Sequence, residues 1–380
     1  MFDETNSLIC PVSGNQKFEE LFTIKSFPIY MGTVDYDYNY EFQDLTFNIC
    51  KTTGTVQIFP RVELEKLYFK SHGSGKIGAL WKEHHEKFFE IIKKYLFGTV
   101  VEIGGGHNSI HSLIGENSQS CKIYSFDPNG ERRKNSNLKV INKFFTEKAM
   151  IEESINSVDL FIHSHLLEHI YDPLNFLNTI QNYLNKDGFH IFSIPNIRAM
   201  IKSGYANAMN FEHPFFLEES LVEDLLSMSG HLIIDKFYLK DHSIIFKTRK
   251  TNTSFIKRKK NYNKYNDNKK LFLKLIKNWK KDVNEINKYM SKSTKNFFLF
   301  GAHIFSQNLL SLGLNTKKIK AILDNDPSKH SNYLYGTNFK VDSPKILRKF
   351  DEPIVILRVG SYKNEIMRGI LEVNKNTIFI

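Results

Sequence analysis

The histidine-rich stretch from His163 to Asp172 carries the side chains best suited to proton transfer. It reads H-S-H-L-L-E-H-I-Y-D and directly follows the apolar run Val158–Ile162. Imidazole titrates near neutral pH, so His169 is suited to accept a proton, and the Glu168 carboxyl group beside it can orient either the ring or a substrate hydroxyl. Residues of these types at the end of an expected strand are able to take part in acid–base chemistry. The alternative for His169 is a structural or cofactor-contacting role at the start of a helix.

The three histidines of this stretch, His163, His165 and His169, also raise the question of a metal site. His163 and His165 lie on either side of the strand end, and no further ligand group stands at a suitable spacing in the sequence. We therefore expect no bound metal.

A second stretch, V-V-E-I-G-G-G-H-N from Val100 to Asn108, is typical of a nucleotide-binding turn. Glycines without a β-carbon let the chain turn sharply off a strand and place backbone N–H groups against a ligand. The next apolar run ends at Asp127, where a carboxylate can accept both hydroxyls of a ribose. A dinucleotide fingerprint would need glycine at position 109, which is Ser109, so the sequence disfavours NAD.

The elements that must position these residues alternate between apolar runs and helical patterns from about residue 76 to residue 246. This order predicts a doubly wound, parallel sheet with helices on both faces. Ligands bind at the carboxyl ends of the strands in such folds, so the glycine turn and the histidine-rich stretch should face one crevice. Within this part we expect a helix at about 109–115, and a turn at 185–188 ahead of a strand at 189–194.

The length of 380 residues predicts more than one domain. We expect an α/β protein with a small β-rich domain at 1–70, a Rossmann-like core at 71–250, a basic helical connector at 251–295 and a second, smaller Rossmann-like domain at 296–380. The last part repeats the pattern of a strand followed by a small-residue turn, but it lacks a full glycine fingerprint.

Two similar short segments mark the N-terminal part, Cys10–Gly14 and Cys50–Gly54. The spacing C-x-x-C-G, used twice, is typical of a structural zinc site. Here Ser13 and Thr53 stand where the second cysteine of each pair would be, and neither hydroxyl is a competent zinc ligand at neutral pH. We expect a β-rich domain that has lost its metal.

The net charge of +11 arises largely from lysines between Lys257 and Lys281. A solvated linker helix explains this charge better than a nucleic-acid surface, so we expect no nucleic-acid partner. Three cysteines, an N-terminus without a signal-peptide pattern and the absence of a long apolar run favour a cytoplasmic protein with no membrane insertion.

The core motifs resemble those of the class I S-adenosylmethionine-dependent methyltransferases. The resemblance rests on E-I-G-G-G-H-N and on the segment from S-V-D-L-F-I-H-S-H-L-L-E-H to D-G-F-H-I-F-S-I-P-N. The full order of the chain, which adds the cysteine segments and the later Gly301-Ala302, is similar to that of deoxysugar C-methyltransferases acting on nucleotide-linked keto sugars.

This resemblance implies S-adenosylmethionine as the cofactor and a small acceptor that contains a sugar or a phosphate, in surface-glycan biosynthesis. It implies catalytic roles for His169, Glu168 and Tyr68. The cofactor-binding residues it implies are Glu102, Gly104, Gly105, Gly106, Asp127, Pro128, Phe145, Ser164, His165 and Ser71. The lost zinc ligands leave open O- or N-methylation of another polar precursor, or a non-catalytic protein, and the oligomeric state is not predicted.

Overall fold

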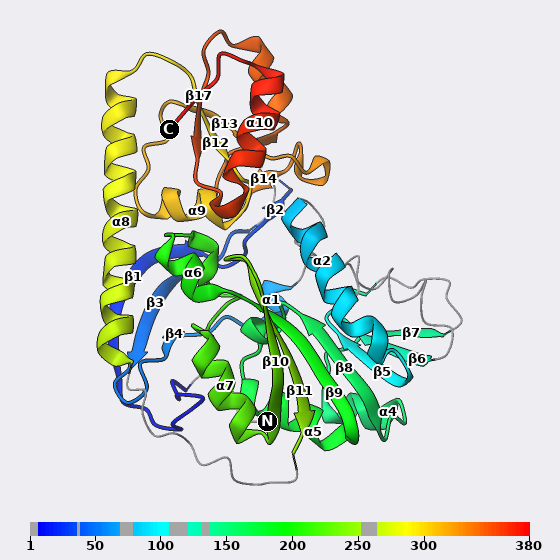
Figure 1. The fold of residues 1–380 in the computed structure, drawn as a ribbon. Coiled ribbons are helices and arrows are strands. Elements are labelled where there is room, and N and C mark those ends of the chain that lie inside the picture. The colour runs from blue at the N-terminus through cyan, green and yellow to red at the C-terminus, as the bar shows by residue number, and fades with distance from the viewer. Residues whose placement is uncertain (1–6, 36–38, 69–78, 106–120, 131–136, 252–263) are drawn as a thin grey trace.

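The computed structural model describes residues 7–35, 39–68, 79–105, 121–130, 137–251 and 264–380 (Figure 1). In this part of the chain the strands form three larger sheets, of three, seven and five strands, and one two-stranded ribbon. The helix expected at 109–115 and residues Ser71 and Gly106 lie outside the described residues. No helix in the described ranges combines the length and the apolar character needed to cross a membrane.

The N-terminal sheet is antiparallel and has the order β1-β3-β4. Its strands are β1 (Phe18–Pro28), β3 (Phe42–Cys50) and β4 (Val56–Ile58). The short strand β2 (Thr33–Val34) pairs with β14 (Tyr333–Leu334), so this part of the chain contacts the C-terminal part directly.

The two cysteine segments form similar turns that face each other. The amide of Gly14 donates to the Cys10 carbonyl and the amide of Gly54 to the Cys50 carbonyl, each at 2.8 Å. Cys10 Sγ lies 3.3 Å from Thr53 Oγ1, and Cys50 Sγ lies 3.8 Å from Ser13 Oγ. The four positions that would hold zinc in a doubled C-x-x-C-G motif therefore meet. Two of them carry a hydroxyl group in place of a cysteine sulfur.

The central sheet has the order β10-β11-β9-β8-β5-β6-β7 and confirms the Rossmann-like α/β core. Neighbouring strands run parallel except at β11, which is antiparallel to both β10 and β9, so the expectation of a parallel sheet fails at that edge. The strands are β5 (Gly98–Ile103), β6 (Cys121–Phe126), β7 (Leu138–Ile141), β8 (Val158–Ser164), β9 (Leu184–Pro195), β10 (His231–Leu239) and β11 (Ser243–Lys250).

Helices cover both faces of this sheet. One face packs against α4 (Glu147–Glu152), α5 (Pro173–Tyr183) and α7 (Glu219–Met228), and the other against α2 (Ala79–Ile92). Asp172 caps α5 by accepting from the amide of Asn175 at 3.0 Å, and Pro173 follows it with a backbone angle already suited to a helix. This cap fixes the helix that follows the histidine-rich stretch.

The prediction that a turn at 185–188 precedes a separate strand at 189–194 is wrong. Residues 184–195 form a single strand, β9. The pairing with β8 nevertheless jumps from Val158–Leu184 to Leu160–Phe189, so residues 185–188 bulge out of the ladder opposite Asp159. The Asn185 side chain donates to the Asp159 carboxylate at 2.6 Å and holds this bulge against β8.

The C-terminal sheet is parallel, with the order β15-β13-β12-β16-β17. Its strands are β12 (Phe297–Phe300), β13 (Ile319–Leu323), β15 (Val341–Asp342), β16 (Ile354–Leu357) and β17 (Ile378–Phe379). The helices α9 (Ile304–Ser311) and α10 (Lys363–Val373) accompany it. The pattern of strands and helices is that of a second, smaller α/β unit.

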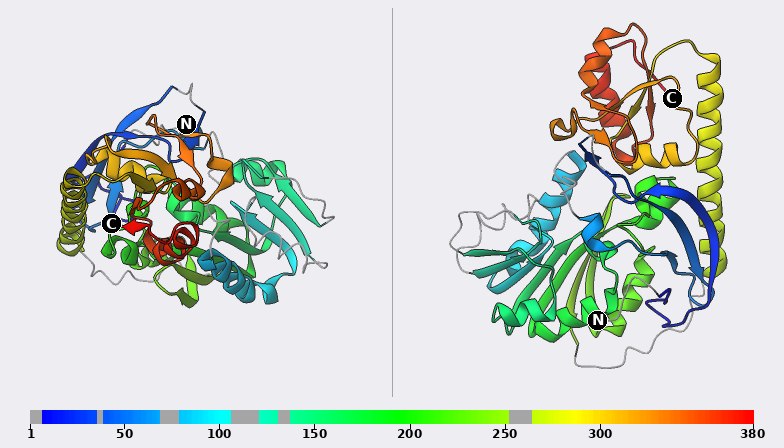
Figure 2. Two further views of the ribbon diagram at one scale, coloured as in Figure 1. Left: turned by 90° about the horizontal axis from the view of Figure 1, so that it is seen from above. Right: turned by 180° about the vertical axis from the view of Figure 1, so that it is seen from behind.

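The helix α8 (Tyr265–Lys292) is not a solvated linker, contrary to the expectation from its charge. Its first half buries Phe272 and Trp279 among N-terminal and core residues, and its second half buries Ile286 and Met290 against the C-terminal sheet. Figure 2 shows it running along the side of both parts. An apolar stripe with a helical period outweighs the lysines on the other face.

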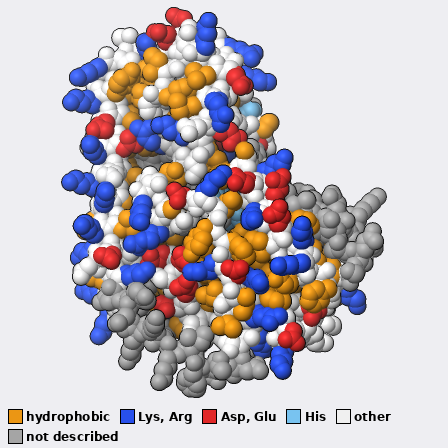
Figure 3. Space-filling view, in the orientation of Figure 1, with side chains coloured by type: hydrophobic (Ala, Val, Ile, Leu, Met, Phe, Trp, Pro, Cys, Tyr) orange, Lys and Arg blue, Asp and Glu red, His pale blue; other side chains and the backbone are white. Residues whose placement is uncertain are grey.

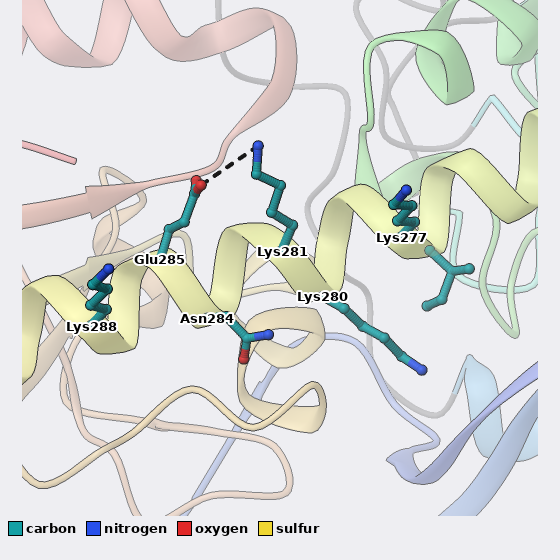
Figure 4. Close-up of a pocket in the computed structure, with 7 residues that line it drawn as sticks. Lys277, Lys280, Lys281, Asn284, Glu285 and Lys288 are labelled. Carbon is teal, nitrogen blue, oxygen red and sulfur yellow. Dashed lines mark ion pairs between the residues drawn. The ribbon is translucent and has the colours of Figure 1, made fainter.

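The lysine-bearing face of α8 borders an open depression of about 570 Å³ (Figure 4). Lysines are also prominent along this edge of the molecule in the space-filling view (Figure 3). The depression is remote from the strand ends that should bind ligands, and α8 alone lines it, so it does not mark the expected site. Its lining residues are Ile276, Lys277, Lys280, Lys281, Asn284, Glu285 and Lys288.

A buried stack of aromatic rings on the central sheet predicts that the stability of the fold falls at acidic pH. The ring of His190 stacks on Phe192 at 4.5 Å, and neither of its nitrogens has a hydrogen-bond partner. Burial lowers the pKa of His190 well below 6.5. As the pH falls below 6.5, the unfolded chain therefore binds a proton at His190 and the folded chain does not, which lowers the free energy of unfolding.

We therefore expect His190→Phe to gain stability relative to the wild type on going from pH 7 to pH 5, by about 2 kcal/mol, because phenylalanine keeps the stacking and has no proton to bind. Urea unfolding at both pH values measures this difference. An equal difference at pH 7 and pH 5 would contradict the stated cause.

Candidate active site

The strand ends of the central sheet bring the two predicted stretches together. β5 pairs with β6 on one side and with β8 on the other, and Ile103 stands opposite both Phe126 and His163. The amide of Gly104 donates to the Phe126 carbonyl at 2.8 Å. The glycine turn, Asp127 and the histidine-rich stretch therefore lie along one edge of the sheet, as expected from the alternating pattern.

The glycine turn closely surrounds the Glu102 side chain. Gly104 has a φ of +73°, which favours glycine, and a β-carbon on Gly105 would lie 1.9 Å from the Glu102 carboxyl carbon. Glu102 is only 3% exposed and accepts from the Ser125 hydroxyl at 3.0 Å. The carboxylate is thus held against the turn, beside a gap too small for a water molecule that Phe88 and Ser164 also line.

Asp127 follows β6 directly and is partly exposed, with one carboxylate oxygen accepting from the Asn129 amide at 2.8 Å. Pro128 beside it is exposed. A buried acid and a partly exposed acid at the ends of adjacent strands, with a side-chain-free turn between them, fit a ligand that carries an amine at one end and a ribose at the other. These groups are chemically compatible with an adenosyl amino acid.

Phe145 belongs to the aromatic core rather than standing alone at the crevice. Its ring lies 5.6 Å from that of Phe126, 5.9 Å from Phe161 and 5.6 Å from Phe176. The side chain is partly buried, so packing is a sufficient reason for its type.

The Glu168-His169 pair lies in the 3-10 turn η2 (Leu167–His169), immediately after β8. The Tyr68 hydroxyl lies 2.7 Å from His169 Nδ1, although 101 residues separate the two in the chain. Tyr68 directly follows the short helix α1 (Leu64–Leu67). The structure therefore brings together the three residues for which the sequence predicted catalysis.

His213 completes this group and was not predicted. Its ring lies 4.5 Å from that of His169, and its Nδ1 lies 3.1 Å from the carbonyl oxygen of Asn207, so Nδ1 carries the hydrogen and Nε2 is left as an acceptor. One ligating atom each of Glu168, His169 and His213 lies within 4.8 Å of the others. The sequence placed His213 in a loop, where nothing indicated its partner.

Burial favours the neutral forms of Glu168, His213 and Tyr68. Glu168 is 1% exposed, and desolvation raises its pKa to about 8. Desolvation also lowers the pKa of His213, and it raises the pKa of Tyr68 well above 10 with a further contribution from Glu212. At neutral pH the carboxyl and phenol groups can therefore both donate hydrogen bonds.

His165 connects this group to a second polar cluster. It adopts a left-handed backbone with φ +50°, its Nδ1 lies 3.7 Å from a Glu168 oxygen, and its Nε2 lies 2.8 Å from Ser243 Oγ. Ser164 bonds to His84 Nε2 and to the Ser193 hydroxyl, each at 2.9 Å. Both residues expected to bind the cofactor thus face α2 and the turn between β10 and β11.

The reasoning against metal ligands was wrong in one respect. Suitable groups do stand beside the histidine-rich stretch, but they come from distant segments: His84 and His242 lie beside His165, and His213 lies beside Glu168 and His169. Spacing along the chain could not reveal them. Desolvation lowers the pKa of His84 to about 3 and that of His242 to about 4, so both rings are neutral at pH 7.

Comparison with known families agrees with this geometry. Residues 77–231 match the family described as methyltransferase domain. This part of the chain is thus similar to a methyltransferase domain. The match includes the glycine turn, both acidic strand ends and the Glu168-His169 pair, and it leaves out the N-terminal and C-terminal sheets. No curated protein matches the chain.

Solved methyltransferase structures share part of the fold at low identity. An O-methyltransferase family protein from Burkholderia thailandensis is 11% identical, with a TM-score of 0.38, and the match covers 46% of this chain and 57% of that one. An S-adenosylmethionine-dependent methyltransferase from Aquifex aeolicus is 13% identical, with a TM-score of 0.33 and coverage of 43% and 89%. A putative type 11 methyltransferase from Sulfolobus solfataricus is 15% identical, with a TM-score of 0.34 and coverage of 45% and 95%.

The crowding at Gly105 gives a direct test of the glycine turn. We expect Gly105→Ala to displace the Glu102 carboxylate and to weaken binding of S-adenosylhomocysteine by about 10-fold to 100-fold, the range for losing a hydrogen bond to a charged group. Isothermal titration calorimetry measures the dissociation constant. Gly369→Ala is the matched control, since a β-carbon there meets nothing within 4 Å. Unchanged affinity of Gly105→Ala would rule out ligand binding at this turn.

Proposed function

We propose that the protein transfers a methyl group to a small polar acceptor and that the Tyr68–His169 pair takes up the proton the acceptor loses. The observation that carries the proposal is the hydrogen bond of 2.7 Å between these two side chains at the strand edge that also holds the glycine turn. The bond joins two titratable side chains from distant segments at this edge, and proton transfer needs such groups within reach of the reacting atoms.

The residues proposed to hold the cofactor are those at the edge of the sheet. Glu102 is placed to receive the amine of the methionine part, and Asp127 to receive the ribose hydroxyls. When bound, S-adenosylmethionine supplies an electrophilic methyl group on a sulfonium. The protein's own task is then to align the acceptor and to move one proton.

The pair can accept one proton in either tautomer of His169. With the ring hydrogen on Nδ1, that atom donates to Tyr68 and Nε2 is the base. With the hydrogen on Nε2, Tyr68 donates to Nδ1, and an acceptor proton passes to the phenol oxygen as the phenol proton passes to the ring. The raised pKa of Tyr68 keeps its hydroxyl protonated between turnovers.

For the acceptor we propose a sugar-containing molecule, most simply a nucleotide-linked sugar of surface-glycan biosynthesis in the cytoplasm. Two features support it. The resemblance to deoxysugar C-methyltransferases extends to the paired N-terminal turns, where Cys10 and Cys50 bond to hydroxyls instead of sulfurs. The polar groups beside His169, namely Glu168, Glu212 and His213, also suit a hydroxyl-rich ligand.

A second candidate is O- or N-methylation of a phosphate-linked or other polar precursor. It is favoured by the departure from the zinc pattern at Ser13 and Thr53, because a changed N-terminal module implies a changed acceptor. In that case the proton comes from a hydroxyl or an amine, and the same pair can accept it.

The catalytic pair predicts a separation of binding from turnover. We expect His169→Ala to lower kcat by about 100-fold or more and Tyr68→Phe to lower it by at least about 10-fold, with little change in the affinity for S-adenosylhomocysteine. Asp127→Ala should do the opposite, weakening cofactor affinity more than it lowers kcat. Loss of cofactor binding in His169→Ala would remove the proton-transfer role.

Transfer of a labelled methyl group to nucleotide-sugar extracts tests the acceptor. Label in a sugar nucleotide supports the proposal, and the position of the methyl group, on carbon or on a heteroatom, separates the two candidates. Failure of the wild type to bind S-adenosylmethionine or S-adenosylhomocysteine in calorimetry would instead indicate a non-catalytic protein.

A further inference from the structure

Three imidazoles converge beside the cofactor edge, outside the group proposed to transfer the proton. His84 comes from α2, His165 follows β8, and His242 lies in the turn between β10 and β11. Their ring centroids are 5.1, 5.3 and 5.6 Å apart, and one nitrogen of each lies within 4.8 Å of the others. Such a nearly equilateral arrangement is the geometry of three ligands around a common point.

Hydrogen bonding among the described residues leaves one nitrogen of these rings unsatisfied. The Ser243 hydroxyl lies 2.8 Å from His165 Nε2 and 2.6 Å from His242 Nδ1, so it can donate to one ring and accept from the other. His84 is fully buried, and its Nδ1 has no hydrogen-bond partner within the described ranges. An orphaned ring nitrogen in a buried place carries a cost that a bound cation would offset.

The surroundings have the features of a metal site's outer shell. The Ser164 hydroxyl bonds to Nε2 of His84, and the Ser243 hydroxyl bonds to Nε2 of His165. Outer partners of metal-bound histidines bond in the same way to the ring nitrogen that does not bind the metal. The Trp81 ring lies 4.8 Å from the rings of both His165 and His242 and covers the cluster. Three histidine nitrogens with a fourth position open suit zinc and similar divalent ions.

We propose that His84, His165 and His242 bind one divalent transition-metal ion, with zinc as the best match, and that this ion fixes α2 and the β10–β11 turn to the end of β8. The site goes beyond the proposed methyl transfer and does not depend on it. α2 otherwise packs on the sheet through apolar contacts of Phe88, Ile91 and Ile92 (Figure 1). The ion would add a link between α2 and the end of β8, at the end of α2 nearest the strand ends.

Zinc titration of the full-length, chelator-treated protein tests the site without cofactor or acceptor. We expect one zinc ion per chain by calorimetry and by metal analysis, together with a rise in melting temperature on zinc addition. His242→Ala should weaken zinc binding by about 100-fold or more, and Ser243→Ala by about 10-fold, through loss of a ligand and of its orienting partner respectively. His242 is only partly buried and lies in a turn, so its variant should fold.

His213→Ala is the matched control, because it removes a histidine from the neighbouring group and leaves all three proposed ligands in place. It should retain one zinc ion per chain with unchanged affinity. The proposal is overturned if the wild type takes up no zinc. It is also overturned if His213→Ala abolishes uptake while His242→Ala retains it, since the ion would then lie at Glu168, His169 and His213. Methyl transfer that is normal in zinc-free protein would leave the proposed function intact.

Discussion

The parallel pairing of β8 between β5 and β9 is the constraint on which the site depends. It aligns Ile103 with His163 and Ser164 with Ser193, so that three strands end at one level. Because parallel strands all present their carboxyl ends to the same edge, the glycine turn and the histidine-rich stretch must lie next to each other. A shift of β8 by one residue would move the His163 side chain to the other face of the sheet.

Burial decides the chemistry of the groups at this edge. Glu168, Tyr68 and His213 are all held in their neutral forms, because the surrounding protein solvates charge less well than water does. In these forms the carboxyl and phenol groups can donate hydrogen bonds to a polar acceptor, and the imidazole can accept one. The same desolvation keeps the imidazoles of His84 and His242 unprotonated, as metal binding requires.

The three sheets share interfaces that help to hold the site. α8 packs against residues of the N-terminal sheet in its first half and against the C-terminal sheet in its second half. Its Trp279 donates to the Gly204 carbonyl at 2.7 Å, and β2 pairs with β14 across the same boundary. The N-terminal part, which ends near Tyr68, is therefore held by contacts with both α8 and the C-terminal part. These contacts help to fix the position of the Tyr68 hydroxyl beside His169.

Sequence alone determined the Rossmann-like core, the two motifs at its strand ends and the pairing of Glu168 with His169. These features depend on local composition: apolar runs, glycines without a β-carbon, and a capping Asp172 ahead of Pro173. The family resemblance also pointed to Tyr68, whose hydroxyl the structure brings to His169.

The tertiary structure decided those features that depend on contacts between residues distant in the chain. The burial of α8 followed from two partners that its charge could not reveal, and the bulge at 185–188 followed from the β8 ladder. His213 beside His169, and His84 and His242 beside His165, come from segments that are distant in the chain. Local patterns fix elements and strand ends, whereas the meeting of side chains across elements depends on how the whole chain packs.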